Sequence, residues 1–285
     1  MGWANDGHGA VPVNTFRSKL LLAMAMVPTL GLIAHHIPPI SRSITIQHER
    51  HWSYDRRAYA RDEELGFRYV PGEYEGHLFV DGVVRATSPV CINRFGNVGR
   101  AVADAPLLVV GDSFTANPID GGIAWTDYLS ESALNRARDG YGVLQMVHLA
   151  ARDPRPRIIV AFITDDLTRD RWDHFSSTDL PRHALKDLRD DPQFSADSWL
   201  LNRAGVALVR IPKRQDMDAG QYIETRRDRQ LLASLRAAMT RARYVELPMD
   251  LGFTPADWRD HDDHPNRRGA EKLAAAIAGA LSQPR

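Results

Sequence analysis

A serine near the middle of the chain and a histidine near its end have the neighbours that nucleophilic catalysis needs. Ser113 stands in the sequence GDSFT, directly after the apolar run LLVV, and His264 follows Asp262 and Asp263. A serine hydroxyl becomes a nucleophile when a histidine removes its proton, and a carboxylate holds that histidine in the required tautomer. The chain therefore contains the three residue types of a Ser-His-Asp arrangement.

Taken locally, the same residues allow other interpretations. Serine and aspartate are favoured where a helix begins, so Asp112 and Ser113 could do no more than start the next helix. The segment around His264 could be a solvated acidic loop. It could also be a metal site made of His261, Asp262 and His264, because carboxylate and imidazole groups suit several metals.

The pattern of apolar residues predicts an α/β domain that would position these groups. Continuous apolar runs at residues 107–111 and 158–163 indicate strands covered on both faces, and residues 244–247 form a weaker third case. Helices are expected at residues 124–135, 143–151, 197–209 and 222–243, and a last helix follows HPNRRG with Leu273, Ala276, Ile277 and Leu281 on one face. We interpret GVALVRIP, residues 205–212, as the end of a helix rather than as a strand. Alternating strands and helices predict a parallel sheet covered on both faces, with ligands at the carboxyl ends of its strands.

The first 40 residues predict a membrane anchor. Arg17 and Lys19 precede a charge-free apolar run at residues 20–34, and the apolar character continues to Ile40. This length approaches the roughly 20 residues that span a bilayer, and no clear cleavage site follows. Because basic flanking residues stay in the cytoplasm, we expect an uncleaved signal anchor in the inner membrane with the main domain exported. A cleaved, secreted form is the alternative.

The rest of the chain divides into two parts. Residues 41–104 are expected to form a linker and a small β-rich annex, in which the alternation at residues 77–80 and the Asp81-Gly82 turn signal predict a β-hairpin. Residues 105–285 are expected to form the main domain.

Charge and cysteine content exclude some classes of function. The chain of 285 residues has 36 basic and 36 acidic residues, so no net charge would attract nucleic acid. Cys91 is the only cysteine, which leaves no disulfide and no thiolate metal site. We expect no nucleic-acid partner, no metal and no cofactor.

Several short segments, taken together, resemble one family. GDSFT at residues 111–115 and DDHPNRRG at residues 262–269 resemble the first and last sequence blocks of the SGNH, or GDSL, hydrolases. DGYGVLQM at residues 139–146 is similar to their second block, and IIVAFITDDLTRD at residues 158–170 occupies the place of the third. DEELGFRYVPG and INRFGNVGR resemble the lead-in segments of bacterial members. The resemblance runs from residue 62 to the carboxyl terminus and implies a three-layer α/β/α sandwich with a flavodoxin-like parallel sheet.

The resemblance also implies roles for single residues. Ser113 matches the nucleophile, and His264 matches the base. Asp262 is the match for the acid, with Asp263 and Asp260 as alternatives. The backbone N–H groups of Ser113 and of a glycine in the second block would hold the oxyanion. Gly140 is our choice for that glycine, and Gly142 is the second choice.

One position departs from the family. The third oxyanion donor of the family is an asparagine side chain followed by aspartate, whereas this chain has Asp165 followed by Asp166. An ionised carboxylate accepts hydrogen bonds and would repel an oxyanion. Three outcomes stay open: Asp165 is protonated in a dry site beside Asp166, Thr164 or another group donates instead, or the enzyme is slow or inactive. Asp112, beside the nucleophile, is a further supporting residue.

The resemblance implies a serine esterase or an O-acyltransferase, because similar members include both. Its substrates would be ester-linked acyl groups of cell-surface glycans or lipids. Two alternatives stay open. One is a domain of the same fold that binds a glycan or a partner protein without turnover, and the other is the metal-dependent hydrolase that His261, Asp262 and His264 could form.

Overall fold

The computed structural model describes residues 50–80, 82–100, 102–117, 123–169, 187–259 and 262–283. The anchor predicted at residues 1–40 lies outside these residues. In the part of the chain that the structure describes, no helix combines the length and the apolar character needed to cross a membrane. By their contacts, Arg50–Phe79 and Val84–Arg285 form one compact unit.

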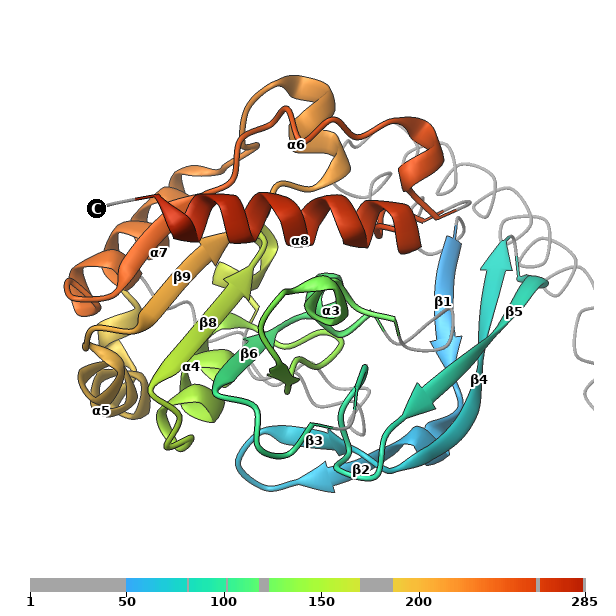
Figure 1. Ribbon diagram of the computed structural model, residues 1–285, viewed down its shortest axis with the longest axis horizontal. Helices are drawn as coiled ribbons and strands as arrows, with labels where there is room; N and C mark the ends of the chain where they lie inside the picture. Colours follow the sequence, from blue (N-terminus) through green and yellow to red (C-terminus); the bar gives the residue numbers. More distant parts are fainter. Residues whose placement is uncertain are drawn as a thin grey trace, which may run out of the picture. The chain divides into compact units, whose positions relative to one another are not determined.

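A parallel sheet of five strands is the centre of this unit (Figure 1). Its strands are β6 (Leu107–Gly111), β7 (Ala133–Asn135), β8 (Arg157–Phe162), β9 (Val206–Arg210) and β10 (Arg243–Glu246). The strand order β10-β9-β8-β6-β7, with every neighbouring pair parallel, is that of flavodoxin-like sheets. The predicted parallel sheet is therefore confirmed, and the strand order reverses at β6, which lies between β7 and β8.

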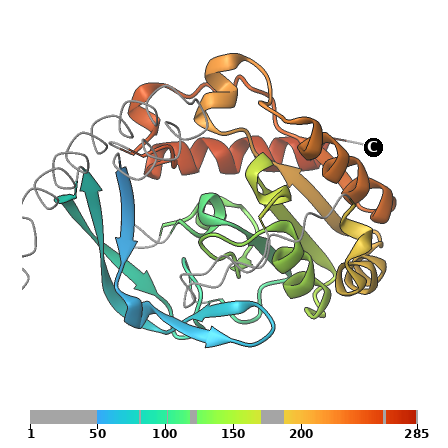
Figure 2. The same ribbon diagram turned by 180° about the vertical axis from the view of Figure 1, so that it is seen from behind.

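Helices cover both faces of the sheet. Helices α4 (Val143–Ala151), α5 (Pro192–Leu201) and α7 (Arg226–Ala238) pack on one face, against alternate strand residues such as Leu108 and Val110. Helix α8 (Arg267–Ser282) packs on the other face, against residues such as Val109 and Ile159 (Figures 1 and 2). The alternation of side chains along each strand thus divides the core into two apolar clusters.

The helix predicted at residues 197–209, which residues 205–212 were expected to end, is wrong in its second half, where the chain forms strand β9. All five of its residues are buried, because it lies between β8 and β10. Helix α5 already ends at Leu201, and Gly205 has a φ of +90°, which favours glycine and separates the helix from the strand. A strand that is buried on both faces has no polar alternation, so its apolar run resembles part of a buried helix.

The helix predicted at residues 124–135 is also wrong. These residues contain a 3-10 helix (Trp125–Tyr128) and the edge strand β7, which pairs with three residues of β6. So short a strand leaves almost no periodic signal in the sequence. The helix predicted at residues 143–151 is confirmed as α4, and the one predicted at residues 222–243 begins only at Arg226.

Residues before the parallel sheet form smaller β structure. Strands β1 (Arg50–Tyr54), β4 (Gly72–Val80) and β5 (Val83–Ile92) make a three-stranded sheet, and β2 (Tyr59–Asp62) pairs antiparallel with β3 (Gly66–Tyr69). The adjacent strands β4 and β5 confirm the predicted hairpin strands. Phe67 of β3 packs edge-on against Tyr141, with ring centroids 5.1 Å apart, so β3 shares a core with α4.

Short helices follow the strands at their carboxyl ends. Helix α3 (Ser113–Ala116) follows β6, a 3-10 helix (Thr164–Leu167) follows β8, and α6 (Arg214–Ala219) follows β9. Further 3-10 turns lie at Arg56–Ala58, Leu188–Asp190 and Pro255–Asp257. The residues that resemble the first and third sequence blocks therefore meet at one edge of the sheet.

Candidate active site

Ser113 is the first residue of α3 and not its cap. The cap is Asp112, whose carboxylate accepts a hydrogen bond of 3.0 Å from the Phe114 N–H. A side chain on Gly111 would approach the Ala161 carbonyl oxygen to 2.7 Å, so glycine is required where the chain turns from β6. The Ser113 hydroxyl is thereby left for another partner, and the interpretation of Ser113 as a helix cap is wrong.

That partner is His264. The Nε2 atom of His264 lies 2.8 Å from Ser113 Oγ, and its Nδ1 atom lies 2.7 Å from Asp262 Oδ1. Asp263 points elsewhere, because its carboxylate accepts a hydrogen bond of 2.9 Å from Gln215 of α6. The structure therefore brings Ser113, His264 and Asp262 into one hydrogen-bonded chain, while Asp260 and His261 lie outside the described residues.

A short hairpin holds the loop that carries the acid and the base. The Arg259 N–H donates to the His264 carbonyl at 3.0 Å, and Trp258 pairs with Pro265 in an antiparallel bridge. Asn266 then caps α8 through its Oδ1 atom and donates from Nδ2 to the Trp258 carbonyl. The loop ends where α8 begins, so packing of α8 on the sheet fixes the position of His264.

Buried Asp257 ties the start of this loop to α8. Its carboxylate accepts hydrogen bonds from the backbone and hydroxyl of Thr254 and from Lys272 of α8. Burial alone would raise the pKa of Asp257, but these donors lower it to about 2. The carboxylate is therefore charged, and it anchors the loop, at any pH near neutrality.

The charges of Asp262 and His264 support each other. Burial, the largest influence, lowers the pKa of His264, but the attraction and the hydrogen bond of Asp262 outweigh burial and leave that pKa above its ordinary value. Burial likewise opposes the charged form of Asp262, yet His264 and Arg259 hold the pKa of Asp262 below its ordinary value. The arrangement stabilises a protonated imidazole beside an ionised carboxylate.

The turn that contains Gly140 lies beside the end of β6. The Arg138 N–H donates to the Gly111 carbonyl at 3.0 Å, and Gly140 has a φ of +78°, which favours glycine. The Gly142 N–H is used by the Gln145 side chain at 3.1 Å. Neither the Gly140 N–H nor the Ser113 N–H donates to another described residue. Gly140 is therefore better suited than Gly142 to bind a ligand oxygen.

The segments that resemble the family's lead-in hold this turn in place. Three hydrogen bonds join them to it: from Asp139 N to Tyr69 Oη (2.9 Å), from Tyr141 Oη to the Phe67 carbonyl (2.7 Å) and from Arg138 Nη2 to Asn97 Oδ1 (3.0 Å). All but Asp139 are buried residues. The small β structure thus supports one side of the candidate site.

Asp165 does not lie in a dry site. Half of its side chain is exposed, and its carboxylate pairs with Lys213 at 2.8 Å. The buried carboxyl is that of Asp166, which accepts hydrogen bonds from the Ile163 N–H and from Arg169 Nη1, both at 2.9 Å. Burial, reinforced by the charge of Asp112, raises the pKa of Asp166 well above its ordinary value. Of the three outcomes left open for this position, the one that needs Asp165 in a dry site is therefore wrong.

Thr164, the other donor considered at this position, is buried and already bonded. Its hydroxyl oxygen accepts a hydrogen bond of 2.6 Å from Arg210 Nη2. Arg210 is itself buried and pairs with Glu224 at 2.5 Å. Thr164 is thus tied to the interior of the sheet.

Arg169 is a residue that the sequence did not single out. Its Nη1 atom lies 2.9 Å from Asp166 Oδ1 and 3.8 Å from Asp112 Oδ2. Burial raises the pKa of Asp112 to about 6, although the charges of Arg169 and His264 lower it. In the sequence, Arg169 is marked only by its place three residues after Asp166. Many arginines stand at this spacing from an aspartate without taking part in a functional site.

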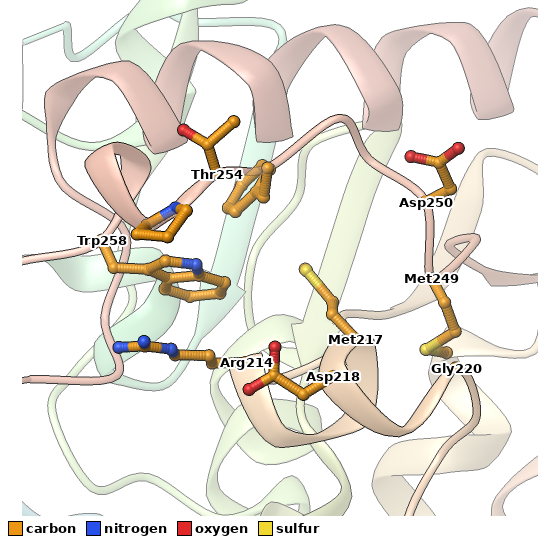
Figure 3. Close-up of a pocket in the computed structure, with 10 residues that line it drawn as sticks. Arg214, Met217, Asp218, Gly220, Met249, Asp250, Thr254 and Trp258 are labelled. Atoms are coloured by element: carbon orange, nitrogen blue, oxygen red, sulfur yellow. The ribbon is translucent and has the colours of Figure 1, made fainter.

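A cavity of about 370 Å³ lies next to the loop that carries His264 (Figure 3). It is lined by Arg214, Met217, Asp218, Gly220, Met249, Asp250, Phe253, Thr254, Pro255 and Trp258. Trp258 and Arg214 lie at one end of it, and Met249 and Asp250 lie at the other. Trp258, which lines the cavity, is the bridge partner of Pro265, the residue that follows His264.

Comparisons with known proteins find little similarity. No family model matches the chain, and no curated protein matches it. Among solved structures, the crystal structure of protein YxiM from Bacillus subtilis is similar, with 14% identity and a TM-score of 0.38. The match covers 72% of this chain and 64% of that chain, so the present chain spans less than two thirds of YxiM.

Proposed function

We propose that the chain is an SGNH-type serine esterase or O-acyltransferase that acts on ester-linked acyl groups. The hydrogen-bonded chain from Ser113 through His264 to Asp262 is the observation that carries this proposal. It lies where the strand order of the sheet reverses, which is the usual ligand site of such sheets. The three residues also stand in the order and sequence context of the family that the chain resembles.

The proposed reaction is acyl transfer through a covalent intermediate. His264 removes the proton of the Ser113 hydroxyl, whose oxygen then bonds to the ester carbonyl carbon. The N–H groups of Ser113 and Gly140 donate to the oxyanion that forms. The ester C–O bond then breaks, and the protonated His264 returns its proton to the departing alcohol. Water or a sugar hydroxyl, activated by His264, releases the acyl group from Ser113.

The cavity beside the loop supports a glycan as the acyl carrier or acceptor. Trp258 and Phe253 offer apolar ring surfaces, and Arg214, Asp218 and Asp250 offer charged hydrogen-bonding groups, which together suit a polyhydroxylated ligand. Asp218→Asn and Arg214→Ala should then raise KM for an acetylated oligosaccharide while turnover of a small ester stays unchanged. Equal effects on both substrates would contradict a glycan site here.

The same proposal places the main domain on the outer side of the cytoplasmic membrane. The apolar run at residues 20–34 is its support, and the enzyme would then meet acylated glycans or lipids of the cell surface. Protease accessibility of the main domain in cells with a permeabilised outer layer tests this placement.

A fluorophosphonate probe tests the nucleophile. The wild-type protein should be labelled, Ser113→Ala should not, and His264→Ala should react far more slowly because the proton acceptor is lost. Absence of labelling in the wild type, or equal labelling of Ser113→Ala, would contradict the proposal that the chain is a serine enzyme. That result would favour a domain that binds a glycan or a partner protein, for which the acidic Asp165 is the supporting observation.

A chelator separates this proposal from a metal-dependent hydrolase. Both ring nitrogens of His264 lie within hydrogen-bond distance of protein oxygens, and His261 lies outside the described residues. The serine mechanism predicts undiminished activity in excess chelator. Loss of activity that added metal restores would favour the metal-dependent alternative.

A further inference from the structure

Arg169 contacts Gly142 with its backbone and reaches Asp112 with its guanidinium. Its backbone lies against Gly142, where an added Cβ would come within 2.3 Å of the Arg169 carbonyl oxygen and 2.9 Å of its Cβ. Its guanidinium ends beside Asp112, with Nη1 3.8 Å from Oδ2. Arg169 therefore lies against Gly142, two positions after Gly140, and its side chain ends next to the residue that precedes Ser113.

The guanidinium is the positive group of an acidic surrounding. It pairs with Asp166 and faces the charges of Asp112, Asp139 and Asp165. Among the described residues only its Nη1 atom makes a hydrogen bond, and 34% of the side chain is exposed. Nε and Nη2 carry N–H groups that no described residue accepts from.

We propose that Arg169 is the third donor of the oxyanion hole, in the place of the asparagine amide that Asp165 cannot supply. An N–H of its guanidinium donates to the oxyanion formed when Ser113 attacks the ester carbonyl. This inference rests on the proposed function, because it assigns a catalytic residue to the same reaction.

The chemistry of the group fits this role. A guanidinium stays protonated at all accessible pH values, and a charge-assisted hydrogen bond to an oxyanion is stronger than one from a neutral amide. Asp166 fixes one nitrogen of the planar group by the bond from Nη1, which orients the remaining N–H groups before substrate arrives. The pair of Asp165 with Lys213 turns the carboxylate of Asp165 toward Lys213.

Substitution of Arg169 tests the proposal by turnover of p-nitrophenyl acetate. Arg169→Met removes the donors and should lower kcat by about 100- to 1000-fold, as expected for one lost oxyanion donor, with little change in KM. Arg169→Lys keeps a cationic donor and should retain much more of the activity. Wild-type kcat in Arg169→Met would overturn the proposal.

A purely structural role predicts a different result in a double variant. Arg169→Met leaves the carboxyls of Asp112 and Asp166 buried without their cation, which by itself could disturb the site. Arg169→Met combined with Asp166→Asn replaces one of these carboxyls with a neutral amide. We expect its melting temperature to recover while kcat stays low. Recovery of kcat together with the melting temperature would overturn the proposal.

Ser113→Ala, measured in parallel, separates this inference from the function on which it rests. Turnover that depends on Ser113 but not on Arg169 would overturn the role of Arg169 and leave the esterase standing. A wild-type protein without turnover that depends on Ser113 would overturn both.

Discussion

The two ring nitrogens of His264 make different bonds, and this difference determines how protonation controls the proposed reaction. Nε2 faces the Ser113 hydroxyl and must be unprotonated to take its proton, while Nδ1 faces Asp262. Because the pKa of His264 is raised overall, more of the imidazole is protonated near neutral pH than in a free histidine. The share of His264 that can act as the base therefore increases as the pH rises.

The pH profile of kcat/KM tests this ionisation. Activity should rise with pH along a limb whose midpoint lies above the ordinary histidine pKa of about 6.5. Asp262→Asn removes the group that raises this pKa, so the limb should move to lower pH and kcat should fall by roughly 10³- to 10⁴-fold. Asp263→Asn is the control, because Asp263 binds Gln215 and not His264. A limb that does not move in Asp262→Asn would contradict the pairing.

Some residues of the site could be predicted from the sequence and others could not. Ser113 and His264 could be predicted because their neighbours match a known pattern. The family's spacing favours Asp262 over Asp263, and the hydrogen bonds of both residues support Asp262. Arg169 could not be found, because its part depends on where a long side chain ends, and spacing along the chain carries no such information.

At the scale of elements, tight contacts between turns position the site. The end of β6 contacts β8 at Gly111, and the start of α4 contacts the segment after β8 at Gly142. In both places a side chain would meet backbone, so the elements approach as closely as glycine allows. Strands β7 and β9 could not be predicted from the sequence. Strand β7 is too short to show a periodic pattern, and β9 lacks the polar alternation of a half-exposed strand.

Gly142→Ala tests this close approach. Its new methyl group would push the Arg169 backbone away, so we expect a loss of roughly 1–3 kcal/mol in the free energy of unfolding and a marked loss of kcat. Gly279→Ala is the matched control, because a Cβ there meets nothing within 4 Å, and helix α8 should gain up to about 1 kcal/mol. Equal stability and activity of the two variants, measured by urea unfolding and ester turnover, would contradict the contact.

At the scale of the whole compact unit, residues far apart in sequence complete one site. The small β structure before residue 107 supports the Gly140 turn, the end of β6 supplies Ser113, and the loop before α8 supplies the acid and base. The sequence predicted the parallel sheet and the β-rich segment separately. It could not predict their contact, since the hydrogen bonds that join them link residues about 70 positions apart.

Tyr69→Phe tests the support that β3 gives the Gly140 turn. Loss of the hydroxyl leaves the Asp139 N–H without its acceptor in a largely buried place, which should cost about 1–3 kcal/mol in stability and lower kcat. Tyr74→Phe is the control, because the Tyr74 hydroxyl bonds the Pro71 carbonyl at an exposed position. Tyr69→Phe with unchanged stability and activity would show that the turn does not need β3.

The most direct test of the central claim is the detection of an acyl group on Ser113. After brief incubation with p-nitrophenyl acetate and rapid acid quenching, mass spectrometry of the digested protein should find an acetyl group on the peptide that contains Ser113. Ser113→Ala should show neither the adduct nor turnover above background. Turnover that persists in Ser113→Ala, with no acetyl group on Ser113 in the wild type, would contradict the account.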